Sequence, residues 1–134
     1  HGFTQNVRAV LDACDVFVLP SRTEGLPNTL LEAMGRGLIP VACAVGGVHE
    51  AWPPGLEPLL VPGWDSPQPD EPAQSPMGRA LAHVLEQDND TLLSWKHAAW
   101  QHCGAHFSLT VQAEKLEQYF ARLVARNERN RRPS

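Results

Sequence analysis

The chain has 134 residues, and its 43% hydrophobic and 19% charged content is typical of a globular domain and too apolar for a disordered segment. Its net charge of −4 gives no support for nucleic-acid binding, and no apolar run approaches the roughly 20 residues that span a bilayer. Three widely spaced cysteines argue against a disulfide framework and favour a cytoplasmic setting.

The first half of the chain alternates between helical and strand patterns. The run "DVFVLPS" is β-branched and aromatic and stops at Pro20, which is typical of a buried parallel strand. Pro27 favours the first position of a helix, and Gly35 and Gly37 are good breakers at its end. We expect helices at 6–14, about 27–36 and, after a glycine-rich turn, within 46–52, and buried strands at 15–21, 38–44 and 58–62. This β-α-β-α-β order implies a parallel sheet with right-handed crossovers.

The second half of the chain predicts a loop followed by three helices. Residues 62–76 are rich in proline and poor in apolar groups, so we expect a surface loop there. Helical patterns follow at 76–87, 90–103 and 108–128. The last pattern has a single apolar stripe with charges opposite, formed by Leu109, Ala113, Leu116, Phe120, Leu123 and Val124. The predicted fold is α/β: half of a doubly wound parallel sheet, helices on both faces, and a helical C-terminal cover.

Two glutamates flank a proline-marked turn in the stretch "EGLPNTLLE". Eight residues at about 100° each leave Glu24 and Glu32 roughly 80° apart, which is a poor shared face even on one unbroken helix. Ligands of open parallel sheets bind beyond the carboxyl ends of the strands, and the loop 20–27 follows directly on the first predicted strand. The pair is therefore better explained by contacts with a ligand at this edge than by one helix face.

The helix that follows this loop favours a phosphate. Its N-terminus presents the positive dipole end and the free N–H groups of Asn28, Thr29 and Leu30. Glu32 cannot bind the same phosphate, because two anions repel, but it can accept hydrogen bonds from ribose hydroxyls, each worth roughly 1.5–3 kcal/mol without water. Glu24 can do the same for hydroxyls on the other side of the phosphate. Ribose, diphosphate and sugar in that order make a nucleotide sugar.

The segment 15–50 resembles the donor-binding segment of the GT-B glycosyltransferases of family 4. In that family a strand ending in Pro-Ser precedes an E-x7-E motif, Glu-Ala-Met, Gly-x-Pro-Val and Gly-Gly-x-x-Glu, and each has its counterpart here in order. The chain departs in "GLIPV", which has one residue more before the proline. The opening "HGFTQNVRAVLDACD" and the closing "FSLTVQAEKLEQYFARL" extend the resemblance over most of the chain, most weakly at 52–104.

The resemblance implies roles for particular residues. Glu24 is the candidate catalytic residue, in contact with hydroxyls of the transferred sugar, and Glu32 holds the ribose hydroxyls. Gly46 and Gly47 match a glycine pair whose loop approaches the site so closely that any side chain would intrude. The implied nucleotide-sugar-binding residues are Glu24, Gly25, Leu26, Pro27, Asn28, Thr29, Leu30, Glu32, Gly46 and Gly47.

The resemblance also implies the activity and the partners. Such enzymes transfer a sugar from a UDP-, GDP- or ADP-sugar with retention of configuration, here to an unknown acceptor sugar or lipid-linked glycan, and resemble metal-independent catalysts. The chain matches part of the second of two Rossmann-like domains, over 1–128, with a disordered basic tail at 129–134. We expect a missing N-terminal GT-B domain and upstream cations, and therefore no transfer by this chain alone. A non-catalytic nucleotide-sugar-binding module and a sugar-nucleotide epimerase stay open as alternatives.

Two further groups of residues have a simpler explanation beside a functional one. The set His97, His102, Cys103 and His106 lacks the usual zinc-ligand spacing and falls in an apolar helical pattern, so packing is favoured and no metal is expected. The basic residues that close the chain are Arg122, Arg126, Arg129, Arg131 and Arg132. They suit a solvated helix end, and alternatively an anionic membrane surface at the inner face, which would fit a lipid-linked acceptor.

Overall fold

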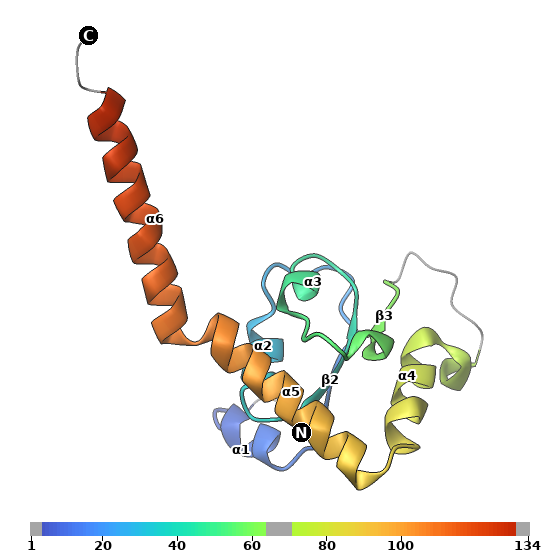
Figure 1. The fold of residues 1–134 in the computed structure, drawn as a ribbon. Helices are drawn as coiled ribbons and strands as arrows, with labels where there is room; N and C mark the ends of the chain where they lie inside the picture. Colours follow the sequence, from blue (N-terminus) through green and yellow to red (C-terminus); the bar gives the residue numbers. More distant parts are fainter. Residues whose placement is uncertain (1–3, 64–70, 131–134) are drawn as a thin grey trace.

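Three parallel strands form the sheet at the centre of the molecule (Figure 1). The structure is a computed structural model and describes residues 4–63 and 71–130. The strands are β1 (Val16–Leu19), β2 (Ile39–Cys43) and β3 (Leu60–Val61), in the order β1-β2-β3. Val16 lies opposite Ile39, and Ala42 lies opposite both Leu19 and Leu60. The predicted parallel arrangement is confirmed, with strands shorter than the sequence pattern indicated.

The helices of the described chain lie close to their expected places. They are α1 (Val7–Asp12), α2 (Asn28–Met34), α3 (Val48–Ala51), α4 (Pro76–Leu85), α5 (Asn89–Phe107) and α6 (Leu109–Asn130). Side-chain caps explain two of the starts, because Ser75 accepts from the Gly78 N–H at 3.0 Å and Asp88 accepts from the Thr91 N–H at 2.7 Å. These caps satisfy N–H groups that have no partner within the helix.

Both predicted ends of α2 were wrong, and so was the predicted start of the third strand. Pro27 is the N-cap of α2 rather than its first residue, and the helix ends at Met34 rather than at residue 36. Gly37, with φ of 75°, then turns the chain toward β2 while its N–H donates to the Met34 carbonyl at 2.9 Å. The strand expected at 58–62 is reduced to β3, because a 3-10 turn (Glu57–Leu59) with a proline in its first turn precedes it.

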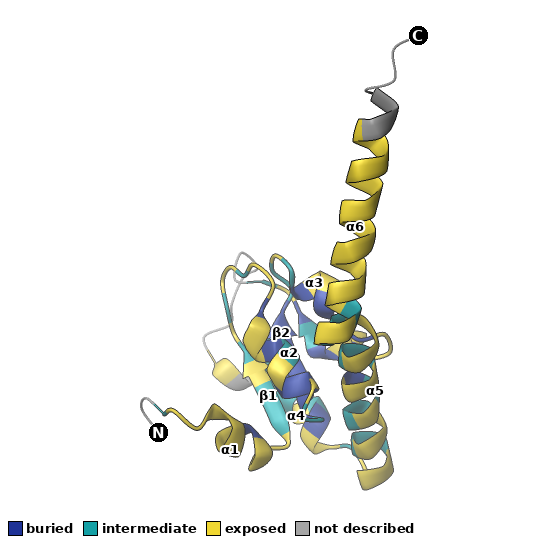
Figure 2. Cartoon of the chain, turned by 90° about the vertical axis from the view of Figure 1, so that its left-hand side faces the viewer, coloured by how far each residue is buried: buried dark blue, intermediate teal, exposed yellow. Residues whose placement is uncertain are grey.

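The core surrounds β2, whose five residues are all buried. Successive side chains of a strand point to opposite faces of the sheet, so the contacts of Val16 and Phe17 in β1 show which helices lie on each face. Phe17 packs against Leu11 and Ala33 of α1 and α2, whereas Val16 lines a hollow with Val84 of α4. Helices therefore flank both faces of the sheet, as predicted, and the buried residues concentrate around β2 and α2 (Figure 2).

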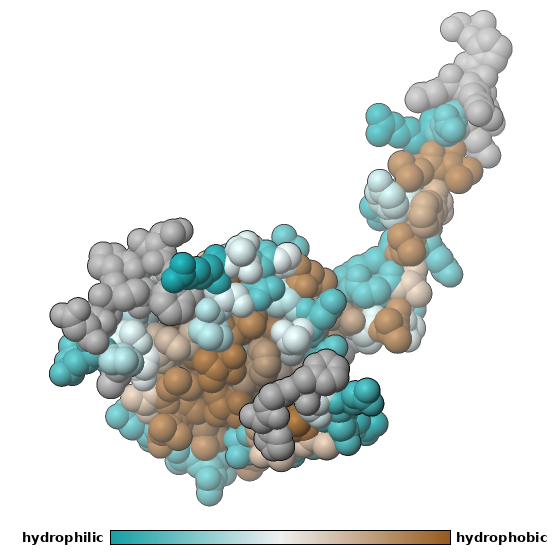
Figure 3. All heavy atoms as spheres, turned by 180° about the vertical axis from the view of Figure 1, so that it is seen from behind, coloured by the Kyte–Doolittle hydropathy of each residue, from teal (hydrophilic) through white to brown (hydrophobic). Residues whose placement is uncertain are grey.

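The outer edge of β1 has no partner strand among the described residues. Val18 is 37% exposed at this edge, and the nearby Leu85 and Leu93 are more exposed still. Seen from the side opposite to Figure 1, apolar side chains gather on the surface of the body (Figure 3). An apolar strand edge of this kind is a template for a further strand.

α4 and α5 provide the helical cover of the sheet, whereas α6 extends away from the body (Figure 1). Exposed residues continue along α6 to the last one whose side chain is described (Figure 2). The helices within 4–63 and 71–130 include none with the length and apolar content needed to cross a membrane.

Two predicted segments lie partly outside the described residues. The structure does not describe residues 64–70 of the proline-rich loop or residues 131–134 of the basic tail. At the borders, a 3-10 turn (Pro72–Gln74) closes the loop, and α6 includes Arg129 and Asn130, which were predicted as tail.

Candidate functional site

Two loops meet at the carboxyl edge of the sheet. The loop 20–27 follows β1, and the loop 44–47 follows β2, so the parallel direction of the strands brings both to the same edge. This is the edge at which open α/β sheets bind ligands. The sequence-predicted site residues are therefore gathered by the fold at one end of the sheet.

The glycine pair Gly46–Gly47 packs directly against the backbone of the first loop. The Gly47 N–H donates to the Gly25 carbonyl at 3.0 Å. A Cβ at Gly46 would lie 1.9 Å from the Glu24 carbonyl oxygen, and one at Gly47 would lie 2.3 Å from the Gly25 carbonyl oxygen. Gly46 also has φ of 49°, which L side chains rarely adopt. Only glycine at both positions permits this contact between the loops.

Glu24 is half-buried where the two loops meet. Its carboxylate accepts a hydrogen bond of 2.5 Å from the hydroxyl of Ser21, which holds one oxygen in a fixed direction. This role of Ser21 was not predicted from the sequence, although the Ser-x-x-Glu spacing puts a donor and an acceptor within reach across a turn. Beside Glu24, Leu26 is 49% exposed and Pro27 is buried. The half-buried Glu24 and the exposed Leu26 are therefore both accessible to a ligand at this loop.

The N-terminus of α2 offers fewer donors than the sequence predicted. The Leu30 N–H donates to the Pro27 carbonyl at 3.0 Å, and the Leu30 side chain is fully buried. The expectation that this N–H is available was wrong, because the helix begins with a tight turn closed on Pro27. Within the described residues, the N–H groups of Asn28 and Thr29 donate to no other group. Two donors therefore remain at this end of α2.

Glu32 lies on the side of α2 that faces α1. It is exposed and lines a cavity of about 350 Å³ with Val7, Arg8 and Leu11 of α1 and with Gly35 and Arg36. Arg36 is held across this cavity by an ion pair with Asp12. Among the described residues the Glu32 carboxylate has neither a hydrogen bond nor an ion pair. It is therefore available to accept hydrogen bonds from a ligand.

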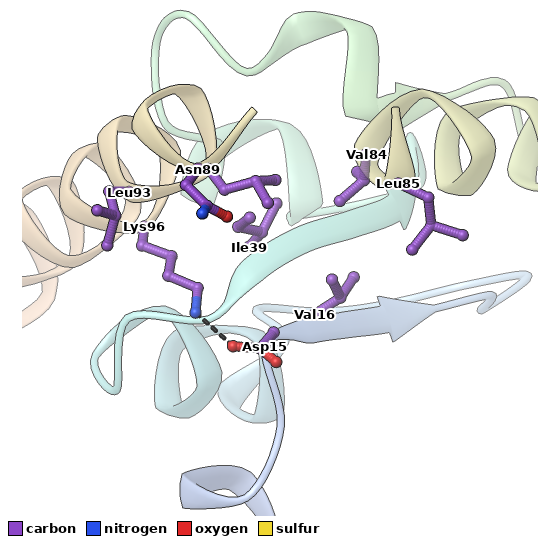
Figure 4. A pocket seen from close by; sticks show the side chains of 9 residues that line it. Asp15, Val16, Ile39, Val84, Leu85, Asn89, Leu93 and Lys96 are labelled. Atoms are coloured by element: carbon purple, nitrogen blue, oxygen red, sulfur yellow. Dashed lines mark hydrogen bonds and ion pairs between the residues drawn. The ribbon is translucent and has the colours of Figure 1, made fainter. Parts of the chain in front are cut away.

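A second cavity, of about 470 Å³, lies at the opposite end of the sheet (Figure 4). It is bounded by the starts of β1 and β2 and by α4 and α5. At its border the Lys96 ammonium donates to Asp15 at 2.5 Å, and this hydrogen bond, with the charge of Lys96, lowers the pKa of Asp15. The rest of the lining is mostly apolar, so the cavity continues the uncovered edge of β1 rather than the site at the carboxyl edge.

The histidines of α5 lie apart from the candidate site and pack with aromatic rings. His102 and His106 have ring centroids 4.7 Å apart, and both lie near Phe107. Burial, and then the charge of His106, lowers the pKa of His102. No group of three His, Cys, Asp or Glu side chains within 4–63 and 71–130 is arranged to hold a metal ion.

The fold is that of an α/β protein with a parallel sheet, and the two loops form a candidate ligand site at its carboxyl edge. The model of the family "Glycosyl transferases group 1" matches residues 1–72, which contain both loops and α2. The chain belongs to the group 1 glycosyltransferase family.

Curated relatives support the same assignment. The chain is 36% identical over 97 residues to "Putative colanic acid biosynthesis glycosyltransferase WcaL" of Salmonella typhimurium. The matched region covers 68% of this chain and 22% of the relative. The Escherichia coli K12 protein of the same name is 35% identical over 95 residues, covering 66% of this chain and 21% of the relative. The chain thus spans about a fifth of the length of the relatives that it matches.

Proposed function

We propose that the chain supplies the donor-binding half-site of a retaining glycosyltransferase that uses a nucleotide-diphosphate sugar. The contact between the glycine pair and the backbone of Glu24 and Gly25 supports this proposal most directly. It places a half-buried carboxylate next to the N-terminus of α2. Glu32, on the same helix, lines a cavity, and its carboxylate has no hydrogen bond or ion pair with the described residues. A sugar, a diphosphate and a ribose follow one another in the same order as these three groups.

Each part of the donor then has its own partner. Glu24 accepts hydrogen bonds from hydroxyls of the transferred sugar, with Gly25, Leu26 and Pro27 lining the pocket beside it. The backbone N–H groups of Asn28 and Thr29 donate to the diphosphate, where the positive end of the helix dipole also favours negative charge. Glu32 accepts from the ribose hydroxyls. The close-packed Gly46–Gly47 loop keeps the wall of the pocket free of side chains.

The chemistry is the departure of the nucleoside diphosphate from the anomeric carbon, which leaves developing positive charge on the sugar and negative charge on the phosphates. Backbone dipoles at α2 stabilise the leaving group without reorganising during the reaction. Two N–H groups are few for a diphosphate, so cationic side chains from the preceding part of a longer parent protein complete the site. Retention of configuration and independence of a metal ion belong to this same proposal.

Two observations support the proposed position of the acceptor and of the missing part of the domain. The outer edge of β1 has no partner strand among the described residues, and the chain spans about a fifth of the length of its relatives. We assign the edge to further strands of the same domain, and the acceptor, a sugar or a lipid-linked glycan, to the cleft facing the preceding GT-B domain. The isolated chain is then expected to bind the donor but not to transfer its sugar. Three unpaired cysteines are consistent with action in the cytoplasm.

Ligand-observed NMR of this chain with UDP-, GDP- and ADP-sugars tests the donor site. We expect one nucleotide class to bind, and binding to be lost in Glu32→Ala, because the ribose hydroxyls lose their acceptor. Glu117→Ala, an exposed helical glutamate outside the site, is the matched control and should bind as the unaltered chain does. Equal binding by Glu32→Ala would contradict the assigned role of Glu32.

Two alternatives predict different products. A non-catalytic module binds the nucleotide sugar and leaves it intact even when the longer parent protein is used. An epimerase of related fold returns a nucleotide sugar of altered configuration without any acceptor. Incubation of the longer parent with the donor that binds, followed by mass spectrometry and proton NMR of the sugar, separates both from transfer.

A further inference from the structure

Ser21 contacts the side chain of Glu24 from the end of the first strand. Its hydroxyl donates to Oε1 of the Glu24 carboxylate at 2.5 Å, and both side chains are half-buried. β1 ends at Leu19, which is paired with β2, and the ring of Pro20 then restricts the backbone before Ser21. The donor of this hydrogen bond is therefore anchored by the sheet.

The backbone of Glu24 is held separately, by the loop that follows β2. A Cβ at Gly46 would lie 1.9 Å from the Glu24 carbonyl oxygen, and the Gly47 N–H donates to the Gly25 carbonyl at 3.0 Å. These contacts fix the place at which the Glu24 side chain leaves the chain, but they do not act on its carboxylate. The hydrogen bond from Ser21 does. The backbone and the carboxylate of Glu24 are thus held from the ends of two neighbouring strands.

The bond from Ser21 reduces the freedom of a flexible side chain. A glutamate that must be ordered when a ligand binds opposes the association, and a hydrogen bond that already orders it lowers this cost. A hydroxyl that donates to a carboxylate forms a charge-assisted bond, which is stronger than a bond between neutral groups. The bond uses Oε1, so Oε2 keeps its capacity to accept from a ligand hydroxyl.

We propose that Ser21 is a positioning residue of the donor site, which orders the Glu24 carboxylate before the donor binds so that Oε2 accepts from a hydroxyl of the transferred sugar. This inference rests on the proposed function, in which Glu24 contacts that sugar. The diphosphate and the ribose are assigned to the N-terminus of α2 and to Glu32. Ser21 therefore acts on the sugar part of the donor, and a nucleoside diphosphate without the sugar does not sense its hydroxyl.

Isothermal titration calorimetry of the 134-residue chain tests this, with UDP-glucose, GDP-mannose and ADP-glucose each measured beside its own nucleoside diphosphate. We expect Ser21→Ala to weaken binding of the nucleotide sugar about three- to tenfold, because one long side chain must then be ordered by the ligand. Binding of the nucleoside diphosphate should not change. Ser21→Thr keeps a hydroxyl and should bind as the unaltered chain does. Ser94→Ala, at an exposed serine of α5, is the matched control.

A double-mutant cycle separates positioning of Glu24 from general support of the loop. If Ser21 acts through Glu24, Ser21→Ala causes no further loss in the Glu24→Ala background. Additive losses in the double variant would overturn the proposal. Equal weakening of the nucleotide sugar and of the nucleoside diphosphate by Ser21→Ala would overturn it too, because the hydroxyl would then support the whole site.

Failure of the donor site and failure of the role of Ser21 give different results. If Glu24→Ala weakens binding of the nucleotide sugar and Ser21→Ala does not, the donor site stands and the role of Ser21 is refuted. If the unaltered chain binds none of these compounds, both the proposed function and this inference are wrong. Urea unfolding with a constant m-value confirms that each variant is folded.

Discussion

Substitution of the paired glycines provides a stringent test of the site geometry. In Gly47→Ala the new methyl group would lie 2.3 Å from the Gly25 carbonyl oxygen, so the two loops must separate. Overpacking of this kind costs about 1–3 kcal/mol, and loss of the Gly47–Gly25 hydrogen bond adds about 1 kcal/mol. We therefore expect Gly47→Ala to lower the free energy of unfolding by about 2–4 kcal/mol, a large share of the 5–15 kcal/mol of an ordinary domain.

Gly46 and Gly55 separate steric overlap from backbone strain. Both have positive φ, 49° and 88°, but a Cβ at Gly55 has no atom within 4 Å, whereas one at Gly46 would lie 1.9 Å from the Glu24 carbonyl oxygen. Gly55→Ala should cost only the left-handed strain, about 1–2 kcal/mol. Gly46→Ala carries this strain and the overlap, so we expect a loss of about 2–5 kcal/mol.

Urea unfolding of the three variants, followed by circular dichroism and tryptophan fluorescence, measures these differences at a constant m-value. Gly46→Ala and Gly47→Ala should also bind the nucleotide sugar less well, because the displaced loop carries Glu24. If Gly46→Ala loses no more stability than Gly55→Ala, the two loops are not in contact and the geometry of the site is wrong.

Three other predictions follow from single side chains. Because Lys96 lowers the pKa of Asp15 below 3.8, the stability from this pair is present above that pH and is lost as the pH falls through the lowered pKa. Asp15→Asn should therefore reduce the free energy of unfolding at neutral pH and make it fall less steeply as the pH is lowered. If urea unfolding gives the same pH dependence below about pH 5 for the variant and the unaltered chain, this expectation is wrong. For His102, whose pKa lies below 6.5, the neutral form is favoured in the fold, so stability falls as the pH drops below 6.5. Removal of the neighbouring charge in His106→Gln should raise the His102 pKa in an NMR titration, and a constant value would refute the charge effect. Burial raises the pKa of the Cys43 thiol and shields it from solvent, so Cys43 should react with a thiol reagent only when the chain opens. The exposed Cys14, after α1, is the reference and should react much faster.

Local patterns predicted the elements of the sheet because their causes are local. β-branched runs ending in proline, a proline before α2 and glycines after it restrict the backbone whatever surrounds them. The same causes explain the errors at boundaries: Pro58 suits a 3-10 turn as well as a strand edge, and only its neighbours decide between them. The alternation of helices and strands then predicted a parallel sheet, because a helix between two strands returns the chain to the edge at which the first strand began.

The two glutamates show where sequence reasoning stops at this site. Their spacing predicted that they do not share a helix face, and they do lie in different surroundings, one between two loops and one in a cavity against α1. The hydrogen bond from Ser21 to Glu24 and the turn that occupies the Leu30 N–H depend on exact backbone angles. A pattern of residue types does not contain such angles.

Periodicity, caps and motif spacing act along the chain, so they were enough to predict the α/β class, the parallel sheet and the candidate site residues. The packing of distant segments, in contrast, brings Gly46 and Gly47 against the backbone of Glu24 and Gly25 and places Glu32 in a cavity that α1 also lines. Packing of this kind also decided that, among the described residues, the apolar stripe of α6 is exposed while α4 and α5 pack on the sheet. An amphipathic pattern predicts that a helix has an apolar face. Only packing between distant segments states what that face meets.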